Sequence, residues 1–170
     1  MSAPDRPPLP YPWQHAAWDL CDRDWRAGRL PHALLIHGCA DIGKRQFAQA
    51  LAHQLLCAEP RPGGACGHCK QCLLLKHDNH PDLVVVAPAE PGKMILVDSI
   101  RAVANFATQT AQQGGWKGIL IDPAEAMNAN SANALLKTLE EPSARTLLML
   151  VSHQPAQVLA TVRSRCRQLR

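Results

Sequence analysis

The sequence lacks any long apolar run, although nearly half of its 170 residues are hydrophobic. Its apolar stretches are only a few residues long, far below the roughly 20 residues that a membrane-spanning helix needs. The first ten residues, MSAPDRPPLP, contain neither the basic start nor the apolar segment of a secretory signal. We therefore expect a cytoplasmic protein without a membrane segment.

A strong charge excess is also lacking. The chain has 18 basic and 14 acidic residues, for a formal net charge of +4. An excess this small does not by itself indicate a nucleic-acid-binding surface. The length fits one compact core better than two, and no internal repeat is visible. We expect a flexible, proline-rich segment over residues 1–10, followed by a single domain over residues 11–170.

Four short apolar runs are typical of buried parallel strands: residues 33–37, 83–87, 118–121 and 147–151. Between them, residues 47–56 and 97–107 carry apolar side chains at helical spacing. The clearest helix begins after Asn128, and Pro142 ends it. This alternation predicts an α/β fold with a parallel sheet, helices on both faces and a ligand site at the carboxyl ends of the strands.

The first expected strand is followed by GCADIGKR, residues 38–45, which fits the G-x-x-x-x-G-K part of a nucleotide-binding loop. Gly38 and Gly43 let backbone N–H groups surround a phosphate, and Lys44 reaches the outer phosphates. The last motif position lacks its Ser or Thr, whose hydroxyl holds magnesium, and has Arg45 instead. A tight turn with an incidental lysine is the alternative, but the strand before it and the helix after it favour a phosphate loop.

Asp122 follows the third expected strand, where an aspartate would lean toward the metal. The next residue is Pro123, so the carboxylate that would orient an attacking water is lacking there, and Glu125 is off register. A capping role after the strand is the alternative for Asp122. We expect a degenerate nucleotide site that leaves ATP binding open and does not favour hydrolysis. Its residues are Gly38, Gly43, Lys44, Arg45 and Asp122.

Four of the seven cysteines lie close together in the sequence: Cys57, Cys66, Cys69 and Cys72. Three of them have C-x-x-C-x-x-C spacing, and the fourth completes the tetrahedral shell of a structural zinc ion with no open position. A cytoplasmic chain disfavours disulfides, and the spacing does not match the usual ferredoxin pattern of an iron–sulfur cluster. A redox pair is the remaining alternative. Zinc is the favoured ligand.

Other residues near the cysteines fit less specific roles. His68 and His80 are substitute metal ligands in principle, but ordinary loop histidines are the simpler interpretation. A zinc-dependent nucleic-acid-binding module needs basic and aromatic side chains, and only Lys70 and Lys76 lie nearby, without an aromatic residue. We rank that module last. The remaining cysteines, expected to be reduced, are Cys21, Cys39 and Cys166.

The tripeptide Ser164-Arg165-Cys166 belongs to the basic tract 163–170. By itself, such a tract is typical of a solvated helix end. The alternative is that Arg165 reaches the phosphate of an ATP bound to a neighbouring subunit, as an arginine finger. The residues alone favour the solvated end.

Taken together, these motifs resemble the clamp-loader family of AAA+ ATPases, over nearly the whole of residues 11–170. The resemblance rests on LPHA at 30–33, the loop at 38–44, the four cysteines, NALLKTLEEP at 133–142 and SRC at 164–166. It implies a RecA-like AAA+ fold with a zinc-binding insertion at 57–80. It also implies that the four cysteines hold zinc, that Arg165 is a finger in trans, and that Ser152 occupies the position that senses the γ-phosphate.

Within this family the gamma and tau subunits hydrolyse ATP, whereas another subunit is a largely rigid stator. Because Arg45 and Pro123 depart from the ATPase motifs, the chain resembles the stator more than the gamma and tau subunits. It implies a DNA polymerase III clamp-loader subunit that helps load the sliding clamp onto primer-template DNA. The implied partners are the gamma, tau and delta subunits, with no intrinsic activity expected. An active ATPase of the gamma or tau type is the alternative, and the family's lid and collar domains are expected to be absent from this chain.

Overall fold

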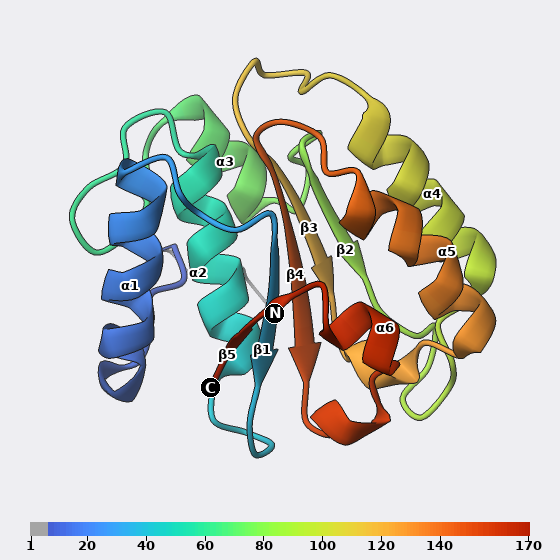
Figure 1. Cartoon of the computed structure of the whole chain (residues 1–170). Coiled ribbons are helices and arrows are strands. Elements are labelled where there is room, and N and C mark those ends of the chain that lie inside the picture. Colours follow the sequence, from blue (N-terminus) through green and yellow to red (C-terminus); the bar gives the residue numbers. More distant parts are fainter. Residues whose placement is uncertain (1–6) are drawn as a thin grey trace.

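The computed structural model, which describes residues 7–170, is a parallel sheet between two layers of helices (Figure 1). Its five strands have the order β2-β3-β4-β1-β5, and every neighbouring pair is parallel. The strands are β1 (Ala33–His37), β2 (Leu83–Val86), β3 (Lys117–Ile121), β4 (Thr146–Ser152) and β5 (Arg167–Leu169). The α/β class and all four predicted strands are confirmed.

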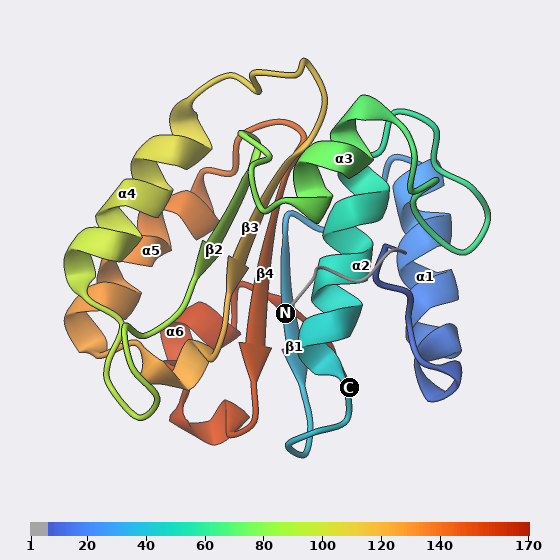
Figure 2. The same ribbon diagram turned by 180° about the vertical axis from the view of Figure 1, so that it is seen from behind.

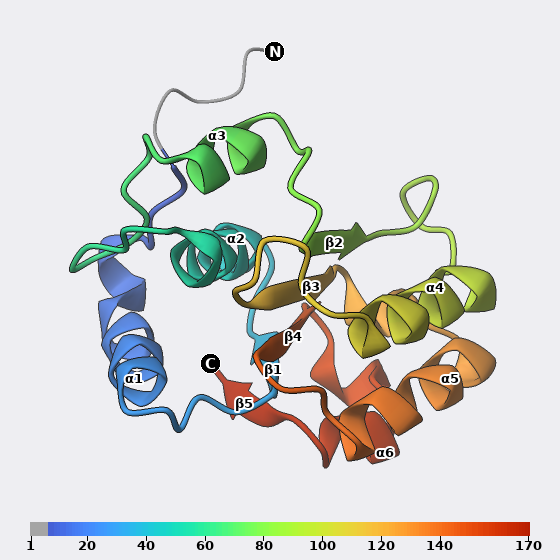
Figure 3. The same cartoon turned by 90° about the horizontal axis from the view of Figure 1, so that it is seen from above.

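Helices cover both faces of the sheet. They are α1 (His15–Arg26), α2 (Lys44–Leu56), α3 (Lys70–Lys76), α4 (Val97–Thr108), α5 (Ala129–Glu140) and α6 (Ala160–Arg163). Three short 3₁₀ helices complete the fold: η1 (Pro12–Gln14), η2 (Ala124–Ala126) and η3 (Pro155–Gln157). Helices α1 and α2 lie on one face and α4, α5 and α6 on the other (Figure 3). The view from behind shows α3 next to α2 (Figure 2).

The core consists of two apolar clusters, one on each face of the sheet, because successive strand side chains point to opposite faces. In β1, Leu34 and Ile36 pack toward α2, whereas Leu35 packs toward α4 and α5. Strand β4, in the middle of the sheet, is buried at every position. Double-sided burial explains why the strands are nearly continuous apolar runs in the sequence.

Helix α5 begins and ends where the sequence predicts. The Asn128 side chain caps it by accepting a 2.8 Å hydrogen bond from the backbone N–H of Ser131. Ala132, Leu135 and Leu139 form the buried face of this helix. This stripe packs against α4 and the sheet, and Asn128 fixes the direction in which the chain enters the helix.

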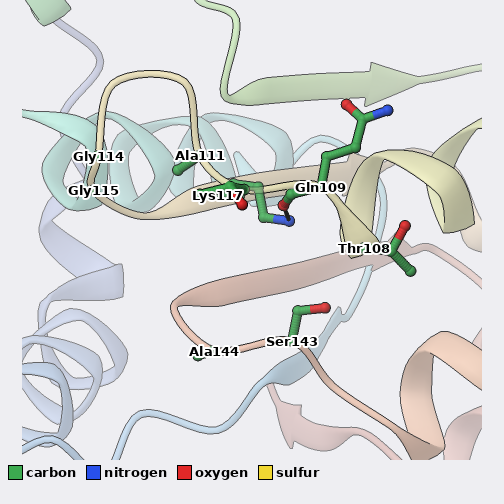
Figure 4. Close-up of a pocket in the computed structure, with 9 residues that line it drawn as sticks. Thr108, Gln109, Ala111, Gly114, Gly115, Lys117, Ser143 and Ala144 are labelled. Atoms are coloured by element: carbon green, nitrogen blue, oxygen red, sulfur yellow. Dashed lines mark hydrogen bonds between the residues drawn. The ribbon is translucent and has the colours of Figure 1, made fainter.

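A buried lysine joins the start of β3 to the end of α4. Lys117 Nζ donates hydrogen bonds to the carbonyl oxygens of Phe106, Ala107 and Gln109, which belong to the last turn of α4 and the residue after it. Figure 4 shows the Lys117 side chain directed at Gln109. A cation at this end of a helix satisfies free carbonyls and complements the helix dipole. Burial lowers the pKa of Lys117, and the nearby carboxylate of Asp82 opposes that shift.

The sequence analysis did not predict helices α1, α3 and α6 or strand β5. The basic tract 163–170 is not a solvated helix end, because α6 stops at Arg163 and the chain then forms β5 beside β1. Arg167 Nη1 donates a 2.7 Å hydrogen bond to Asp24 Oδ2 of α1. This ion pair joins β5 to α1, and part of the basic charge is therefore internal to the fold.

Of the segment 1–10 expected to be flexible, residues 1–6 lie outside the described residues. Residues 7–10 have no regular structure, yet the carbonyl of Leu9 accepts a 2.7 Å hydrogen bond from Gln46 Nε2 of α2. This stretch therefore lies against the domain. Within residues 7–170, no helix combines the length and apolarity that a membrane span requires.

Candidate nucleotide site and cysteine centre

The phosphate loop lies between β1 and α2, at the carboxyl end of the sheet, as predicted. Gly43 precedes the helix with a φ of 80°, a conformation that favours glycine. A Cβ atom there would also come within 2.4 Å of the Tyr11 ring. Gly43 thus allows the backbone conformation of the loop and leaves room for the Tyr11 ring to pack against it.

Residues of η1 and its flank hold the loop from outside. Trp13 Nε1 donates to the carbonyl of Ile42 at 3.1 Å, and Gln14 Nε2 donates to the carbonyls of Ile42 and Gly43, both at 3.0 Å. The ring of Tyr11 stacks on Trp13 with centroids 4.6 Å apart. The sequence analysis missed this contact, since it joins residues nearly 30 positions apart and no local pattern signals it.

Lys44, the lysine of the motif, points back into the loop. Its residue exposure is only 4%, and Nζ donates to the carbonyls of Gly38, at 3.0 Å, and Cys39. Burial lowers the pKa of Lys44, while the carboxylates of Glu125 and Asp122 oppose the shift. A phosphate in the loop would compete with two carbonyl groups for this ammonium group.

Arg45 and Asp122 form an ion pair across the end of the sheet. Arg45 Nη1 lies 2.9 Å from Asp122 Oδ2, and the Asp122 side chain is only 9% exposed. These are the residues that the motif assigns to the two protein contacts of magnesium, the hydroxyl and the aspartate. Here the aspartate is bound by a guanidinium group instead, so the expected defect at Arg45 extends to Asp122.

A second carboxylate, that of Glu125, lies beside the end of β4. Its Oε1 accepts a 2.9 Å hydrogen bond from the backbone N–H of His153, and among the described residues its buried Oε2 has no hydrogen-bond partner. Burial raises the pKa of Glu125, but the neighbouring polar groups of Ser152 and His153 outweigh it and hold the pKa below its usual value. The sequence analysis set Glu125 aside as off register. The fold nevertheless brings its carboxylate next to Ser152, the residue predicted to sense the γ-phosphate.

The four predicted cysteine ligands come together between α2 and α3. Their sulfur atoms all lie within 4.8 Å of one another, with 3.9 Å between Cys57 and Cys69, 3.9 Å between Cys66 and Cys72, and 3.6 Å between Cys57 and Cys72. Sulfur atoms about 2.3 Å from a tetrahedral zinc ion lie about 3.8 Å apart. These distances fit a metal centre and are too long for disulfide bonds.

The backbone around the cysteines is arranged for sulfur atoms that carry negative charge. The N–H of Cys66 donates to Cys57 Sγ at 3.3 Å, and the N–H of Gly67 donates to Cys72 Sγ at 3.4 Å. Burial would raise the pKa of the Cys69 thiol, but N–H and S–H donors lower it to about 6. Burial raises the pKa of Cys57 and Cys72. A metal cation would therefore supply the charge needed to keep all four sulfurs ionised.

The two histidines near the cysteines have other partners. His68 Nε2 accepts a 2.9 Å hydrogen bond from Arg61. His80, which is 5% exposed, contacts Gln71 Oε1 through Nε2 and accepts the N–H of Asp82 at Nδ1. Neither histidine belongs to the group of four sulfurs. His80 instead anchors the end of the insertion to the start of β2.

Arg165 lies apart from the phosphate loop, between α6 and β5. Its Nη2 is 2.7 Å from Glu140 Oε1 of α5, and its Nη1 donates to the carbonyl of Thr161 at 2.8 Å. The Arg165 side chain is 36% exposed. Among residues 7–170, no hydrogen bond or ion pair joins Arg165 to the loop, so it does not complete the nucleotide site of its own chain.

Comparisons with known proteins agree with this architecture. The model of the family described as "DNA polymerase III, delta subunit" matches residues 13–170. The DNA polymerase III subunit delta' of Pseudomonas aeruginosa is 54% identical over 93% of this chain and 47% of its own length. The corresponding Escherichia coli subunit is 39% identical over 92% of this chain and 47% of its own length. The chain thus spans about half the length of the curated relatives it matches.

Solved structures give the same fold. A DNA polymerase III gamma subunit-related protein from Thermotoga maritima superposes with a TM-score of 0.57 at 20% identity, covering 82% of this chain and 40% of the other. At this identity the likeness concerns the fold alone. The expected AAA+ fold is confirmed.

Proposed function

Since the chain belongs to the family of DNA polymerase III delta subunits, we propose that it is the ATPase-type domain of a clamp loader's delta-prime subunit. In this proposal it is a largely rigid stator that helps load the sliding clamp onto primed DNA. It works as part of the DNA-directed DNA polymerase III holoenzyme and has no ATP turnover of its own. The observation that carries the proposal is the ion pair between Arg45 and Asp122, 2.9 Å apart, where an ATPase would hold magnesium.

The absence of turnover follows from the chemistry that the site would need. Hydrolysis of a phosphoanhydride requires a metal ion on the phosphates and a carboxylate that orients the attacking water. Arg45 replaces the hydroxyl ligand and binds the aspartate, and Pro123 stands where the second carboxylate belongs. A site with these residues keeps the phosphate loop but lacks the metal ligands and the water-orienting carboxylate that hydrolysis needs.

In the second part of the proposal, Arg165 acts in trans. Its side chain is partly exposed and is held by Glu140, which is itself 50% exposed. Such surface ion pairs contribute only about 0–1 kcal/mol, so an ATP phosphate on a neighbouring gamma or tau subunit can take the place of Glu140. The delta subunit, the clamp and the primer-template DNA are further proposed partners, reached through the complex.

The third part concerns the cysteine centre, for which we propose a structural zinc ion held by Cys57, Cys66, Cys69 and Cys72. Zinc fits because all four donors are sulfur, the spacing is tetrahedral and no ligand position is left for water. When bound, it would fix residues 57–80, which contribute few side chains to the apolar core. The chain's own N–H groups orient the sulfurs for this role.

The proposal is tested in a clamp loader reconstituted from full-length subunits, by measuring ATP turnover stimulated by clamp and primed DNA. We expect Arg165→Ala to lower turnover by about 10³-fold, as loss of an arginine finger does, and Lys44→Ala to leave it nearly unchanged. Arg101→Ala is the matched control, since Arg101 is also exposed and pairs with a carboxylate one turn away. Normal turnover with Arg165→Ala would refute the finger.

A second candidate function is an active ATPase of the gamma or tau type. The observation in its favour is that Lys44 is intact and that the ionised Glu125 lies close to it and to Ser152. The same experiment separates the two functions. If Lys44→Ala abolishes turnover and Arg165→Ala does not, the chain hydrolyses ATP itself.

A further inference from the structure

Three segments that are far apart in the sequence meet at the amino-terminal edge of the sheet, opposite the phosphate loop. They are α3 in the cysteine insertion, the segment that leads into β2, and the 109–116 loop between α4 and β3 (Figure 1). Four residues join them: Gln71 from α3, His80 and Asp82 from the segment before β2, and Gln113 from the loop. His80 and Asp82 are 5% and 1% exposed, so much of this polar group is internal.

The hydrogen bonds among these four residues form a closed ring. The N–H of Asp82 donates to His80 Nδ1 at 3.1 Å, so the imidazole carries its proton on Nε2, which donates to Gln71 Oε1 at 2.9 Å. Gln71 Nε2 donates to Gln113 Oε1 at 3.3 Å, and the N–H of Gln113 donates to Asp82 Oδ2 at 2.8 Å. Because each of the four residues both donates and accepts, the three segments hold one another in place.

Gln71 lies next to the proposed metal ligands, between Cys69 and Cys72, in the first turn of α3. A helix of seven residues is too short to be stable by itself, and of these seven Cys72 and Leu75 are buried. The position of Gln71 therefore depends on the four sulfurs that hold α3. In the proposed function it depends on the zinc ion between them.

The 109–116 loop is held mainly by Asp82. Residues 112–115 are exposed, so apolar packing contributes little to their position. Gly114 and Gly115 also line a cavity of about 290 Å³ together with Ser143 and Ala144 (Figure 4). The Asp82 carboxylate accepts the N–H groups of two consecutive residues, at 2.7 Å and 2.8 Å. Hydrogen bonds to a carboxylate this deeply buried restrain a loop more than hydrogen bonds in water do.

We propose that this ring couples the cysteine centre to the 109–116 loop, so that metal binding at the centre determines how well the loop is ordered. With the metal bound, α3 presents Gln71 to the ring, and Asp82 stays buried and fixes the loop. Without the metal, Gln71 leaves the ring, water reaches Asp82 and the loop loosens, while the sheet stays folded. The inference rests on the proposed function, because it takes the cysteine centre to hold zinc.

The test is hydrogen exchange of the full-length subunit over residues 109–116, before and after zinc is removed with a chelator. Wild-type exchange there should rise at least about tenfold on chelation and return when zinc chloride is added. Gln71→Ala keeps all four sulfurs and should bind zinc as the wild type does. Its loop should nevertheless exchange fast with zinc bound and respond little to chelation. Gln112→Ala is the matched control, since Gln112 contacts Asp82 through its backbone N–H, and it should behave like the wild type.

Unchanged exchange of the loop, while chelation speeds exchange over residues 57–80, would overturn the inference and leave the proposed zinc centre intact. An equal rise in β1 and β4 would also overturn it, because the whole domain and not the loop would then respond. A Gln71→Ala loop as protected as that of the wild type would show that the ring does not carry the coupling. If neither the insertion nor the loop responds to chelation, the proposed zinc centre itself fails, and the inference fails with it.

Discussion

Negatively charged groups lie at both ends of helix α2, and their charge is balanced differently at each end. At its C-terminal end, Cys57 joins three further sulfurs, and the proposed metal ion would balance their charge once they are ionised. At its N-terminal end, Arg45 balances the buried carboxylate of Asp122 with a side chain. In the proposed function the cysteine centre therefore takes its cation from solution, whereas at the other end the cation is the side chain of Arg45.

The difference also concerns what surrounds each centre. The cysteine insertion is a loop with one short helix, and it contributes few side chains to the two apolar clusters. The phosphate loop connects β1 to α2, both of which are central to the core. Loss of the cation should thus disorder the insertion and leave the loop's framework folded.

The largest expected effect is that of Cys72→Ser or of metal chelation. Either change should cost the insertion on the order of 4 kcal/mol of local stability, because in the proposed function metal ligation takes the place of an apolar core there. Hydrogen exchange over residues 57–80 should rise strongly, while exchange in β1 and β4 stays slow. Cys39→Ser, which alters an exposed cysteine outside the centre, is the control. Unchanged exchange after chelation would contradict a structural metal.

A smaller effect is expected from pH, through His53 in the last turn of α2. Burial lowers the pKa of His53 from its usual 6.5 to about 4, and its Nδ1 is buried without a partner. The unfolded chain therefore takes up this proton first as the pH falls. The free energy of unfolding should be unaffected by His53 above pH 6.5 and should fall by up to about 3 kcal/mol between pH 6.5 and pH 4.

The measurement is chemical denaturation of the wild type and of His53→Gln across this pH range. The difference between the two proteins isolates His53 from the carboxylates and sulfurs, which also bind protons. His77→Gln is the matched control, because His77 is exposed whereas His53 is largely buried. A difference that does not change with pH would show that His53 is not buried in its neutral form.

Features that depend on contacts between residues close in the sequence were predicted, whereas features that depend on contacts between distant residues were missed. Strands β1 to β4 were predicted because each is an apolar run, and the cysteine centre because most of its ligands are three residues apart. Strand β5 was missed since, of its three residues, only Leu169 is buried, too few to show a period. Helix α1 was missed although Trp18 and Cys21 form a buried stripe.

At the candidate nucleotide site, the sequence singled out residues but did not indicate their contacts. Arg45 and Asp122 are 77 positions apart, and only the pairing of the strands brings them together. The motif shows that a hydroxyl is missing at position 45, but it does not show where the arginine points. Glu125 was set aside on register alone, because the turn through η2 that carries it to Ser152 has no sequence signal.

The smallest expected effect concerns the stability that the Arg45–Asp122 pair contributes. A double-mutant cycle with Arg45→Thr and Asp122→Asn should give a coupling energy of about 1 kcal/mol, because Arg45 is half exposed while Asp122 is not. The exposed pair Arg101–Asp98, whose side chains are 68% and 82% exposed, should give about 0.3 kcal/mol in the same cycle. Magnesium should stabilise the Arg45→Thr protein and not the wild type, since only the variant offers Asp122 to a metal. If the two coupling energies are equal and magnesium has no effect on either protein, Arg45 is an ordinary surface arginine, and the contrast between the two ends of α2 fails at this end.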